Sequence, residues 1–111
     1  MKALFHVNEL DRWAHALLNI TNLLRDVGTG EVTVEVVANG PAVIAYRLGS
    51  DDALRQMDEL HAKGVAFVAC RNALQMQNIP EESLAPFVTV VPAGITEIVR
   101  KQAMGYAYIK P

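Results

Sequence analysis

The sequence predicts an α/β fold: a three-layer α/β/α sandwich around a mainly parallel sheet of about five strands. Short apolar runs rich in β-branched residues, such as residues 32–37 and 65–70, alternate with longer stretches in which apolar residues recur every three or four positions. The first pattern is typical of strands buried on both faces and the second of amphipathic helices. Strands separated by helices are joined by right-handed crossovers and therefore lie parallel.

The first strand and the first long helix are predicted from residues 2–28. The strand covers Lys2–Val7, and Asn8 then occupies the position of a helix N-cap. Apolar residues at alternating spacings of three and four form one face of the helix: Leu10, Trp13, Leu17, Ile20 and Leu24. Gly28 is expected to end this helix, because glycine readily adopts the backbone conformations found after helix ends.

The rest of the chain is predicted to alternate strands and helices in the same way. Further strands are expected at residues 31–38, 65–69, 87–91 and 106–109, and helices at 42–47, between Ser50 and Gly64, at 73–77 and at 95–104, with one helical turn at 81–84. In the last helix, the spacing places Ile95, Ile98 and Val99 on one apolar side. Glu97 and Lys101 are one helical turn apart and are expected to pair.

Length and composition indicate a single globular domain spanning residues 1–111. Apolar residues make up 51% of the chain, and 10 basic residues face 12 acidic ones, which leaves a net charge of −2. This balance does not favour nucleic acid or anionic lipid as a partner. The single cysteine cannot close a disulfide within the chain, and no apolar stretch approaches the roughly 18 residues of a membrane span. We therefore expect a cytoplasmic protein without a membrane partner.

Four predicted strands end in segments with distinctive residues. The segments are Asn8-Glu9, Asn39-Gly40-Pro41, Cys70-Arg71-Asn72 and Pro92-Ala93-Gly94. Because parallel strands bring their carboxyl ends to one edge of the sheet, where ligands bind in such folds, we expect these segments to share a site. The binding residues predicted around Cys70 are Asn39, Gly40, Arg71, Asn72, Pro92, Ala93 and Gly94.

Cys70 is the one residue of this set that is capable of nucleophilic or redox chemistry. A thiol between a strand end and a helix start lies near unpaired backbone amides, and Arg71 adds a positive charge, so both features favour the thiolate. The other interpretation is a small apolar residue that finishes a buried strand, since free cysteines are among the most often buried residues. The chemistry of the residue alone favours this second interpretation.

The histidines and glycines do not indicate a metal or cofactor. His6, His15 and His61 are scattered and show no metal-ligand spacing, so we expect no metal. His6 lies near the end of the first strand and could reach the predicted site, but a histidine in a buried strand is more often a core residue. Neither a dinucleotide-binding glycine pattern nor a phosphate-binding loop occurs, and no cofactor is predicted.

Several segments, taken in order, resemble the DsrE/DsrF-like family. The segments are residues 19–24, 36–41, 65–74, 79–80, 88–95 and 102–111. The resemblance covers nearly the whole chain and depends on the order and spacing of these segments rather than on one motif. It implies an α/β sandwich that assembles into homotrimers or hexamers, with a strand-end cysteine on a crest of loops. In such proteins that cysteine carries sulfur as a persulfide, in sulfur oxidation or transfer-RNA thiolation.

The resemblance assigns the carrier position to Cys70. Asn39-Gly40, Asn72 and Pro92-Ala93-Gly94 match the segments expected around it. One departure concerns the residue before the glycine, where family members often have a histidine and this chain has Asn39. An amide can form hydrogen bonds there but cannot act as a base.

Two functions therefore remain open at this point. In the first, Cys70 accepts sulfane sulfur from a donor protein or small thiol and passes it to an acceptor thiol, as a carrier or a sulfurtransferase. One cysteine suffices for carriage, although release then requires a thiol from another molecule. In the second, the protein is a non-catalytic oligomeric module that binds a small ligand or a partner. The reactivity of the thiol distinguishes the two.

Overall fold

One five-stranded sheet organises the part of the chain described by the computed structural model, residues 1–50 and 52–111. The strands are β1 (Lys2–Val7), β2 (Thr33–Ala38), β3 (Ala66–Cys70), β4 (Val88–Val91) and β5 (Ala107–Ile109). All neighbouring pairs are parallel, in the order β4-β3-β2-β1-β5. The helices are α1 (Trp13–Val27), α2 (Asp52–Ala62), α3 (Arg71–Met76) and α4 (Gly94–Ala103), and 3-10 segments cover Leu10–Arg12, Gly40–Tyr46 and Glu81–Ser83.

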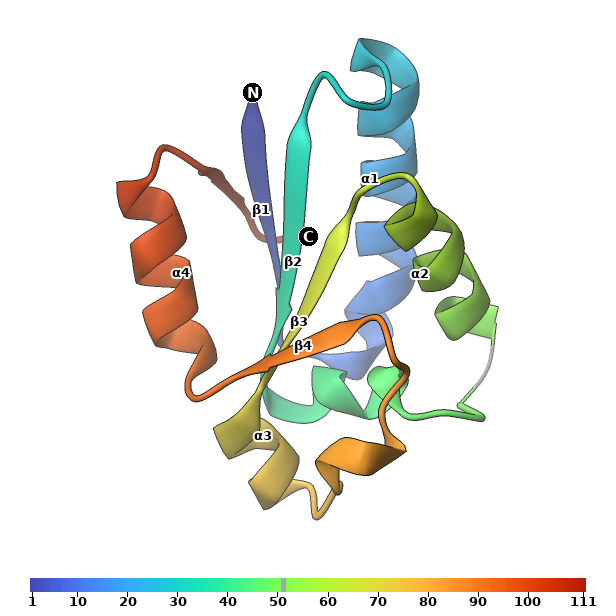
Figure 1. Ribbon diagram of the computed structural model, residues 1–111, viewed down its shortest axis with the longest axis vertical. Coiled ribbons are helices and arrows are strands. Elements are labelled where there is room, and N and C mark those ends of the chain that lie inside the picture. Colours follow the sequence, from blue (N-terminus) through green and yellow to red (C-terminus); the bar gives the residue numbers. More distant parts are fainter. Residues whose placement is uncertain (51) are drawn as a thin grey trace.

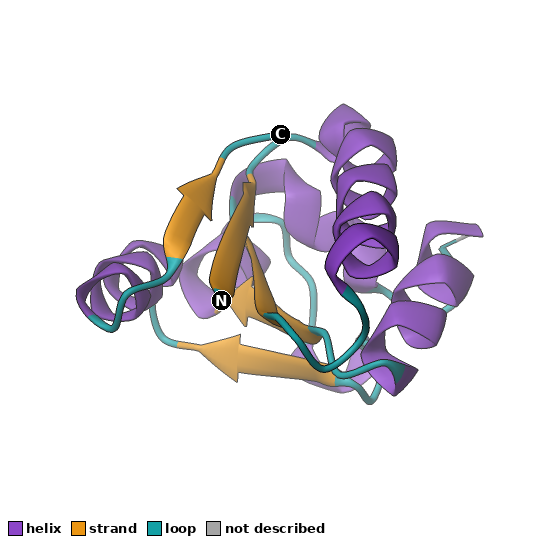
Figure 2. Cartoon of the chain, turned by 90° about the horizontal axis from the view of Figure 1, so that it is seen from above, coloured by secondary structure: helices purple, strands orange, loops and turns teal. Residues whose placement is uncertain are grey.

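The helices form layers on both faces of this sheet (Figures 1 and 2). The chain adds β1 to β4 in one direction with α1 and α2 on one face, and then returns through α4 on the other face to place β5 beside β1. Right-handed connections running in opposite directions lie on opposite faces, which explains the third layer. The predicted three-layer α/β/α sandwich with a five-stranded parallel sheet is thus confirmed. None of the helices in the described residues is long and apolar enough to cross a membrane.

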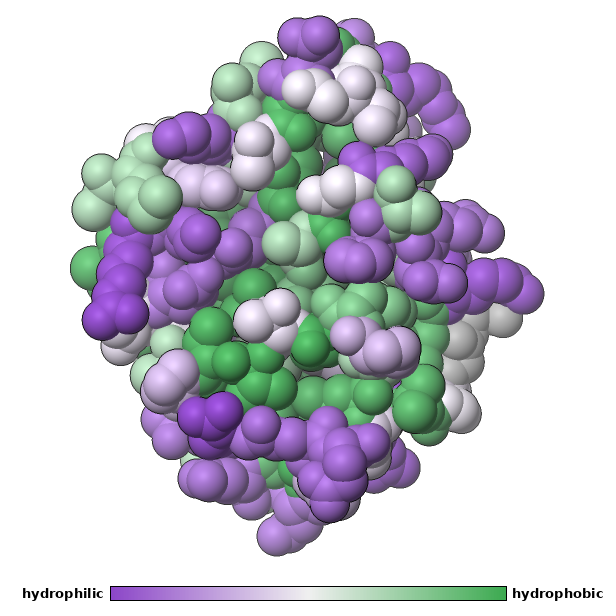
Figure 3. Space-filling model, viewed as in Figure 1, coloured by the Kyte–Doolittle hydropathy of each residue, from purple (hydrophilic) through white to green (hydrophobic). Residues whose placement is uncertain are grey.

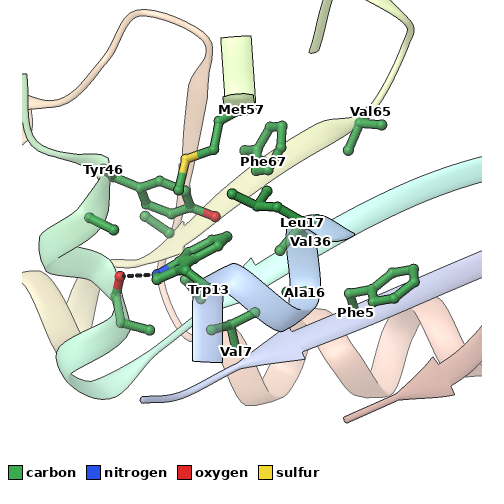
Figure 4. Close-up of a cluster of buried hydrophobic side chains, with 14 of the residues drawn as sticks. Phe5, Val7, Trp13, Ala16, Leu17, Val36, Tyr46, Met57, Val65 and Phe67 are labelled. Atoms are coloured by element: carbon green, nitrogen blue, oxygen red, sulfur yellow. Dashed lines mark hydrogen bonds between the residues drawn. The ribbon is translucent and has the colours of Figure 1, made fainter. Parts of the chain in front are cut away.

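The larger core lies between the sheet and the α1 and α2 layer (Figure 4). Trp13 packs edge-on against Tyr46, with ring centroids 5.3 Å apart, and Phe67 contacts both rings. Polar atoms on these rings are satisfied by backbone carbonyls. Trp13 Nε1 donates to the oxygen of Ala42 at 2.9 Å, and the Tyr46 hydroxyl donates to the oxygen of Val68 at 3.1 Å. The polar atoms of these two buried rings are therefore paired inside the core, as buried polar groups usually are.

The α4 face of the sheet carries a smaller core. Its buried apolar residues are Leu4, Val37, Val68 and Ile98. Of the three residues predicted to share one side of this helix, Ile98 is buried, whereas Ile95 and Val99 are 59% and 61% exposed. Glu97 and Lys101 pair as predicted, with 4.0 Å between carboxylate and ammonium, and Lys101 also lies 3.4 Å from the Glu35 carboxylate on β2.

The start of the first helix differs from the prediction. The chain enters it through the 3-10 segment Leu10–Arg12, and the α-helix begins at Trp13. Asn8 is not the N-cap, because its side-chain oxygen accepts a hydrogen bond from Lys110 Nζ at 2.9 Å instead. Leu10 is 47% exposed and does not belong to the buried stripe. Gly28 ends the helix with a φ of 96°, as predicted.

The other predicted elements are present, with ends shifted by one or two residues. The segment predicted as a helix at 42–47 is the 3-10 segment Gly40–Tyr46. Cys70, expected just after its strand, is the last residue of β3.

Candidate functional site

The ends of β2, β3 and β4 meet at Gly94. A Cβ atom placed on this glycine would lie 3.2 Å from the Cβ of Cys70 and 3.5 Å from the Cβ of Asn39. The first distance is shorter than most Cβ contacts, so a side chain here would require Cys70 to move, and a glycine as the first residue of α4 lets the three segments approach closely. Gly40 similarly allows close approach to the loop after β1. A Cβ there would lie 3.0 Å from the Asn8 carbonyl oxygen, and its φ of 54° is a backbone conformation that favours glycine.

A pocket of about 360 Å³ opens at this junction, at the lower edge of the sheet in Figure 1. Its walls are formed by Asn39, Gly40, Pro41, Cys70, Asn72, Ala73, Met76, Gln77, Ala93, Gly94 and Ile95. Five of the predicted binding residues are therefore brought together around Cys70, and Ala73, Met76, Gln77 and Ile95 are lining residues that the sequence did not identify. Three carboxamides line the pocket and no charged side chain does, among the residues that the structure describes.

Two predicted site residues lie outside these walls. The Arg71 guanidinium forms an ion pair with Glu81, with 2.6 Å between Nε and Oε2, and its side chain is 41% exposed. The hydrogen bond and the charge of Glu81 raise the pKa of Arg71. A carboxylate thus offsets the positive charge expected to favour the Cys70 thiolate. Pro92 borders a neighbouring hollow of about 170 Å³ that Thr96 also lines.

Cys70 is positioned by the alternation of side chains along β3. It lies two residues beyond Val68, whose side chain belongs to the α4-side core, and the alternation directs its Cβ to the same side, beside Gly94. At the sheet edge the residue also packs with the larger core. The residue is 7% exposed and precedes α3 in an extended conformation, without forming a side-chain hydrogen bond to the helix. The thiol is thus enclosed by protein and reaches solvent through the pocket.

His6 is connected to the pocket, although the sequence favoured a core role for it. Its Nε2 lies 2.9 Å from Asn39 Oδ1, and its Nδ1 lies 2.6 Å from the Tyr108 hydroxyl. The side chain is 8% exposed, so it is at once a buried, paired histidine and the neighbour of a pocket residue. The same alternation could have found it, since His6 follows Leu4 by two positions just as Asn39 follows Val37.

The remaining chemistry-bearing side chains lie elsewhere. His61 Nδ1 is 3.1 Å from the Val65 oxygen, and its ring stacks on Phe87. Among the described residues, no group of three His, Cys, Asp or Glu side chains is placed to hold a metal ion. The arrangement at the sheet edge therefore offers one nucleophile, neutral hydrogen-bond donors and a small open pocket.

Comparison with known proteins places this geometry in a family. The model of the DsrE/DsrF-like family matches residues 6–111. A solved structure of a protein of unknown function, MTH1491 from Methanobacterium thermoautotrophicum, is similar to the chain with 33% identity and a TM-score of 0.89, over 99% of this chain and 98% of that one. No curated protein matches. Because the family model matches nearly the full length, the chain belongs to the DsrE/DsrF-like family.

Proposed function

We propose that this protein is a sulfur-relay protein in which Cys70 carries sulfane sulfur as a persulfide. The observation that carries the proposal is the position of the chain's single thiol at the carboxyl edge of the sheet, in the wall of a pocket of about 360 Å³. Family membership supports it, since the DsrE/DsrF-like family is associated with sulfur relay. The pocket offers the space that a bound sulfur and a donor group require.

The loading step is a thiol exchange in which atoms and charge balance. The Cys70 thiolate attacks the terminal sulfur of a donor persulfide, R–S–SH, and a new S–S bond forms at Cys70 Sγ. The S–S bond of the donor breaks, and RS⁻ leaves with its electron pair. The terminal sulfur keeps its hydrogen, so the products are Cys70–S–SH and the donor thiolate. No external oxidant or reductant is needed.

Unloading requires a thiol from another molecule. The chain has one cysteine, so no internal thiol exists to displace the carried sulfur. An acceptor thiolate attacks the terminal sulfur and releases the Cys70 thiolate, which returns the protein to its starting state. The proposed partners are therefore a sulfur donor and a sulfur acceptor, each a protein or a small thiol, in a reducing cytoplasm where a free cysteine persists.

A second candidate function is a binding module without chemistry at the thiol. The observation that favours it is the burial of Cys70, which is 7% exposed and packs against the Gly94 backbone. In that case the three carboxamides and apolar walls hold a small ligand, and Cys70 serves as a small apolar residue.

We also propose that the chain forms a closed homo-oligomer, a trimer or a dimer of trimers. β4 is an edge strand, and apolar residues gather over it in the middle of the view in Figure 3. Ile95 and Val99 on α4 are exposed as well. An exposed apolar area next to an unpaired strand edge is typical of an interface. Light scattering at micromolar concentration and physiological salt should give a mass of three or six chains, and a monomer would contradict the proposal.

The experiment that tests the relay is intact mass spectrometry after incubation with sodium polysulfide. The wild-type protein should gain the mass of one sulfur atom per chain, the gain should be reversed by dithiothreitol, and Cys70→Ser should gain nothing. Circular dichroism of both proteins controls for folding. If the wild type gains no sulfur from polysulfide or from glutathione persulfide, or if iodoacetamide leaves Cys70 unmodified in the folded protein, the binding module is the better description.

A further inference from the structure

A hydrogen-bonded chain of three side chains reaches from the edge of the sheet to the pocket of Cys70. It runs from Tyr108 on β5 through His6 on β1 to Asn39 after β2, with distances of 2.6 and 2.9 Å. Asn39 is part of the pocket wall, whereas His6 and Tyr108 are not. The carboxamide of Asn39 therefore separates a buried histidine from the space in front of the thiol.

The hydrogen bonds determine which way the carboxamide faces. Asn39 Oδ1 is an acceptor, so His6 Nε2 must carry a hydrogen and donate to it. A neutral ring then has an acceptor at Nδ1, which the Tyr108 hydroxyl satisfies by donating. With Oδ1 held by His6, the Nδ2 amide group occupies the opposite side of the carboxamide. Among the described residues, no partner is seen for this amide group.

A hydrogen-bond donor in this pocket could stabilise an anionic sulfur at Cys70. A thiolate or a persulfide anion at Cys70 needs positive potential or hydrogen-bond donors, and no charged side chain lines the pocket in the described part of the chain. Arg71, the neighbouring cation, is paired with Glu81. Neutral donors are thus what the walls offer, and Asn39 shares with Cys70 the close contact at Gly94. A hydrogen bond to a charged acceptor is stronger than one between neutral groups.

We propose that His6 is a positioning residue, which holds the Asn39 carboxamide with its Nδ2 group toward Cys70 so that it stabilises the thiolate and the persulfide anion. Tyr108 supports His6 from the other side. The inference rests on the proposed function for its biological meaning, because the donor serves a reactive sulfur. Asn39 stands where family members often have a histidine, and it cannot act as a base. A fixed hydrogen-bond donor at this position can nevertheless favour the Cys70 thiolate.

The test measures the rate at which iodoacetamide alkylates Cys70 in the folded protein, as a function of pH. Asn39→Ala removes the donor and His6→Leu removes its support, so each should lower the rate at neutral pH about tenfold, as expected for the loss of one charge-assisted hydrogen bond. Both should move the pH profile of alkylation toward higher pH and leave the rate at alkaline pH unchanged. His6→Gln keeps an amide donor toward Asn39 and should retain most of the wild-type rate.

A double-mutant cycle decides whether the two residues act as one unit. If His6 acts through Asn39, the His6→Leu/Asn39→Ala protein should be no slower than Asn39→Ala alone. Additive losses, or a His6→Leu protein with the wild-type pH profile, would overturn the inference. Tyr108 is 41% exposed. Should His6→Leu fail to fold, Tyr108→Phe replaces it in the cycle, with a loss of about twofold expected and the same non-additivity required.

The alkylation measurement is independent of sulfur loading. A wild type that reacts as described with iodoacetamide but accepts no sulfur would contradict the proposed function and leave the positioning of Asn39 intact. A protein that accepts sulfur on Cys70, with alkylation unaffected in Asn39→Ala, would contradict the positioning and leave the relay intact.

Discussion

The two faces of the sheet differ in what they bury. The face toward α1 and α2 buries four aromatic rings, those of Phe5, Trp13, Tyr46 and Phe67, and the polar atoms of Trp13 and Tyr46 are paired with backbone carbonyls. The face toward α4 has one covering helix and buries four apolar residues beside Glu35 and His6, while Cys70 lies at the sheet edge, where it meets Gly94 and also packs with the larger core. One face thus supplies stability, and the other tolerates polar groups that chemistry requires.

The clearest sign of this difference is a carboxyl group on β2. Glu35 is 6% exposed, and its Oε2 has no hydrogen-bond partner. Burial raises its pKa from 4.5 to about 7, the hydrogen bond and charge of Glu97 add to the rise, and Lys101 opposes it. The main core contains no comparable group among the described residues. On the α4 face, ionisation of Glu35 therefore lowers the stability of the fold. The substitutions described next test this difference between the two faces.

The largest effect is expected from truncating a buried side chain on the face of the sheet toward α1 and α2. Phe67 is 1% exposed and contacts Trp13, Tyr46 and Phe87. Phe67→Ala should lower the free energy of unfolding by about 3–5 kcal/mol, through lost burial and the cavity left behind. Urea denaturation measures this loss, and Leu18→Ala on α1, at a position 56% exposed, serves as the control with a small effect. A loss below about 1 kcal/mol would show that this core repacks and that the contrast between the faces is overstated.

The next effect concerns the pH dependence created by the α4 face. Because the folded state holds the Glu35 proton up to about pH 7 while the unfolded state loses it near 4.5, ionisation opposes folding. Stability should therefore be unaffected by this group below pH 4.5, fall as the pH rises to about 7 and remain lowered above it. The fall should be about 3 kcal/mol, at about 1.4 kcal/mol per pKa unit.

Glu35→Gln should flatten this part of the stability profile, measured by urea denaturation between pH 5 and 8. The exposed Glu59→Gln provides a matched control and should keep the wild-type slope. Equal slopes in all three proteins would mean that the buried carboxyl is not the source.

A smaller effect on stability is expected at Gly94, which lies beside Cys70 at the edge of the sheet. Gly94→Ala places a methyl group 3.2 Å from the Cβ of Cys70 and 3.4 Å from Val37 Cγ1. The resulting overpacking should cost about 1–3 kcal/mol and change the rate of Cys70 alkylation. Gly30→Ala has open space but a φ of 92°, so it should cost stability through backbone strain and leave alkylation unchanged. Similar alkylation rates in both variants would show that the close contact does not shape the site.

The smallest effect is expected at Arg71. Because its guanidinium is exposed and paired with Glu81, Arg71→Gln should change the Cys70 alkylation rate by less than about twofold. Glu81→Gln, which frees the arginine, should raise the rate at low ionic strength and lose this effect as salt is added. A large loss in Arg71→Gln would restore the role that the sequence suggested for this cation.

Much of the fold follows from local patterns. Periodicity predicts the strands and helices, and the rule that parallel strands share a carboxyl edge predicts that Asn39, Cys70 and Gly94 lie together. These features depend on residues close in sequence or on a general property of parallel sheets. The family resemblance agreed with them and is confirmed by the family match over residues 6–111.

The errors concern side chains whose partners are distant in sequence. Arg71 turns toward Glu81, ten residues further along, and so leaves the pocket. On α4, the half-buried Lys101 lies 3.4 Å from the Glu35 carboxylate on β2, whereas Ile95 and Val99 are exposed. His6 meets Asn39 across 33 positions. No local pattern contains these pairings, since each is decided only when the strands come together.

The position of β5 has a consequence for the order in which the protein folds. Its Tyr108 contacts His6 across 102 positions in the chain, and β5 pairs with β1 alone. Closing a loop of this length costs conformational entropy, so we expect the β1–β5 pairing to form late in folding. A chain that has assembled β1 to β4 already contains Cys70 at its strand end, but it lacks the Tyr108 contact to His6. The surroundings of the thiol are therefore completed only when the last strand docks, and its reactivity reports on whether folding has finished.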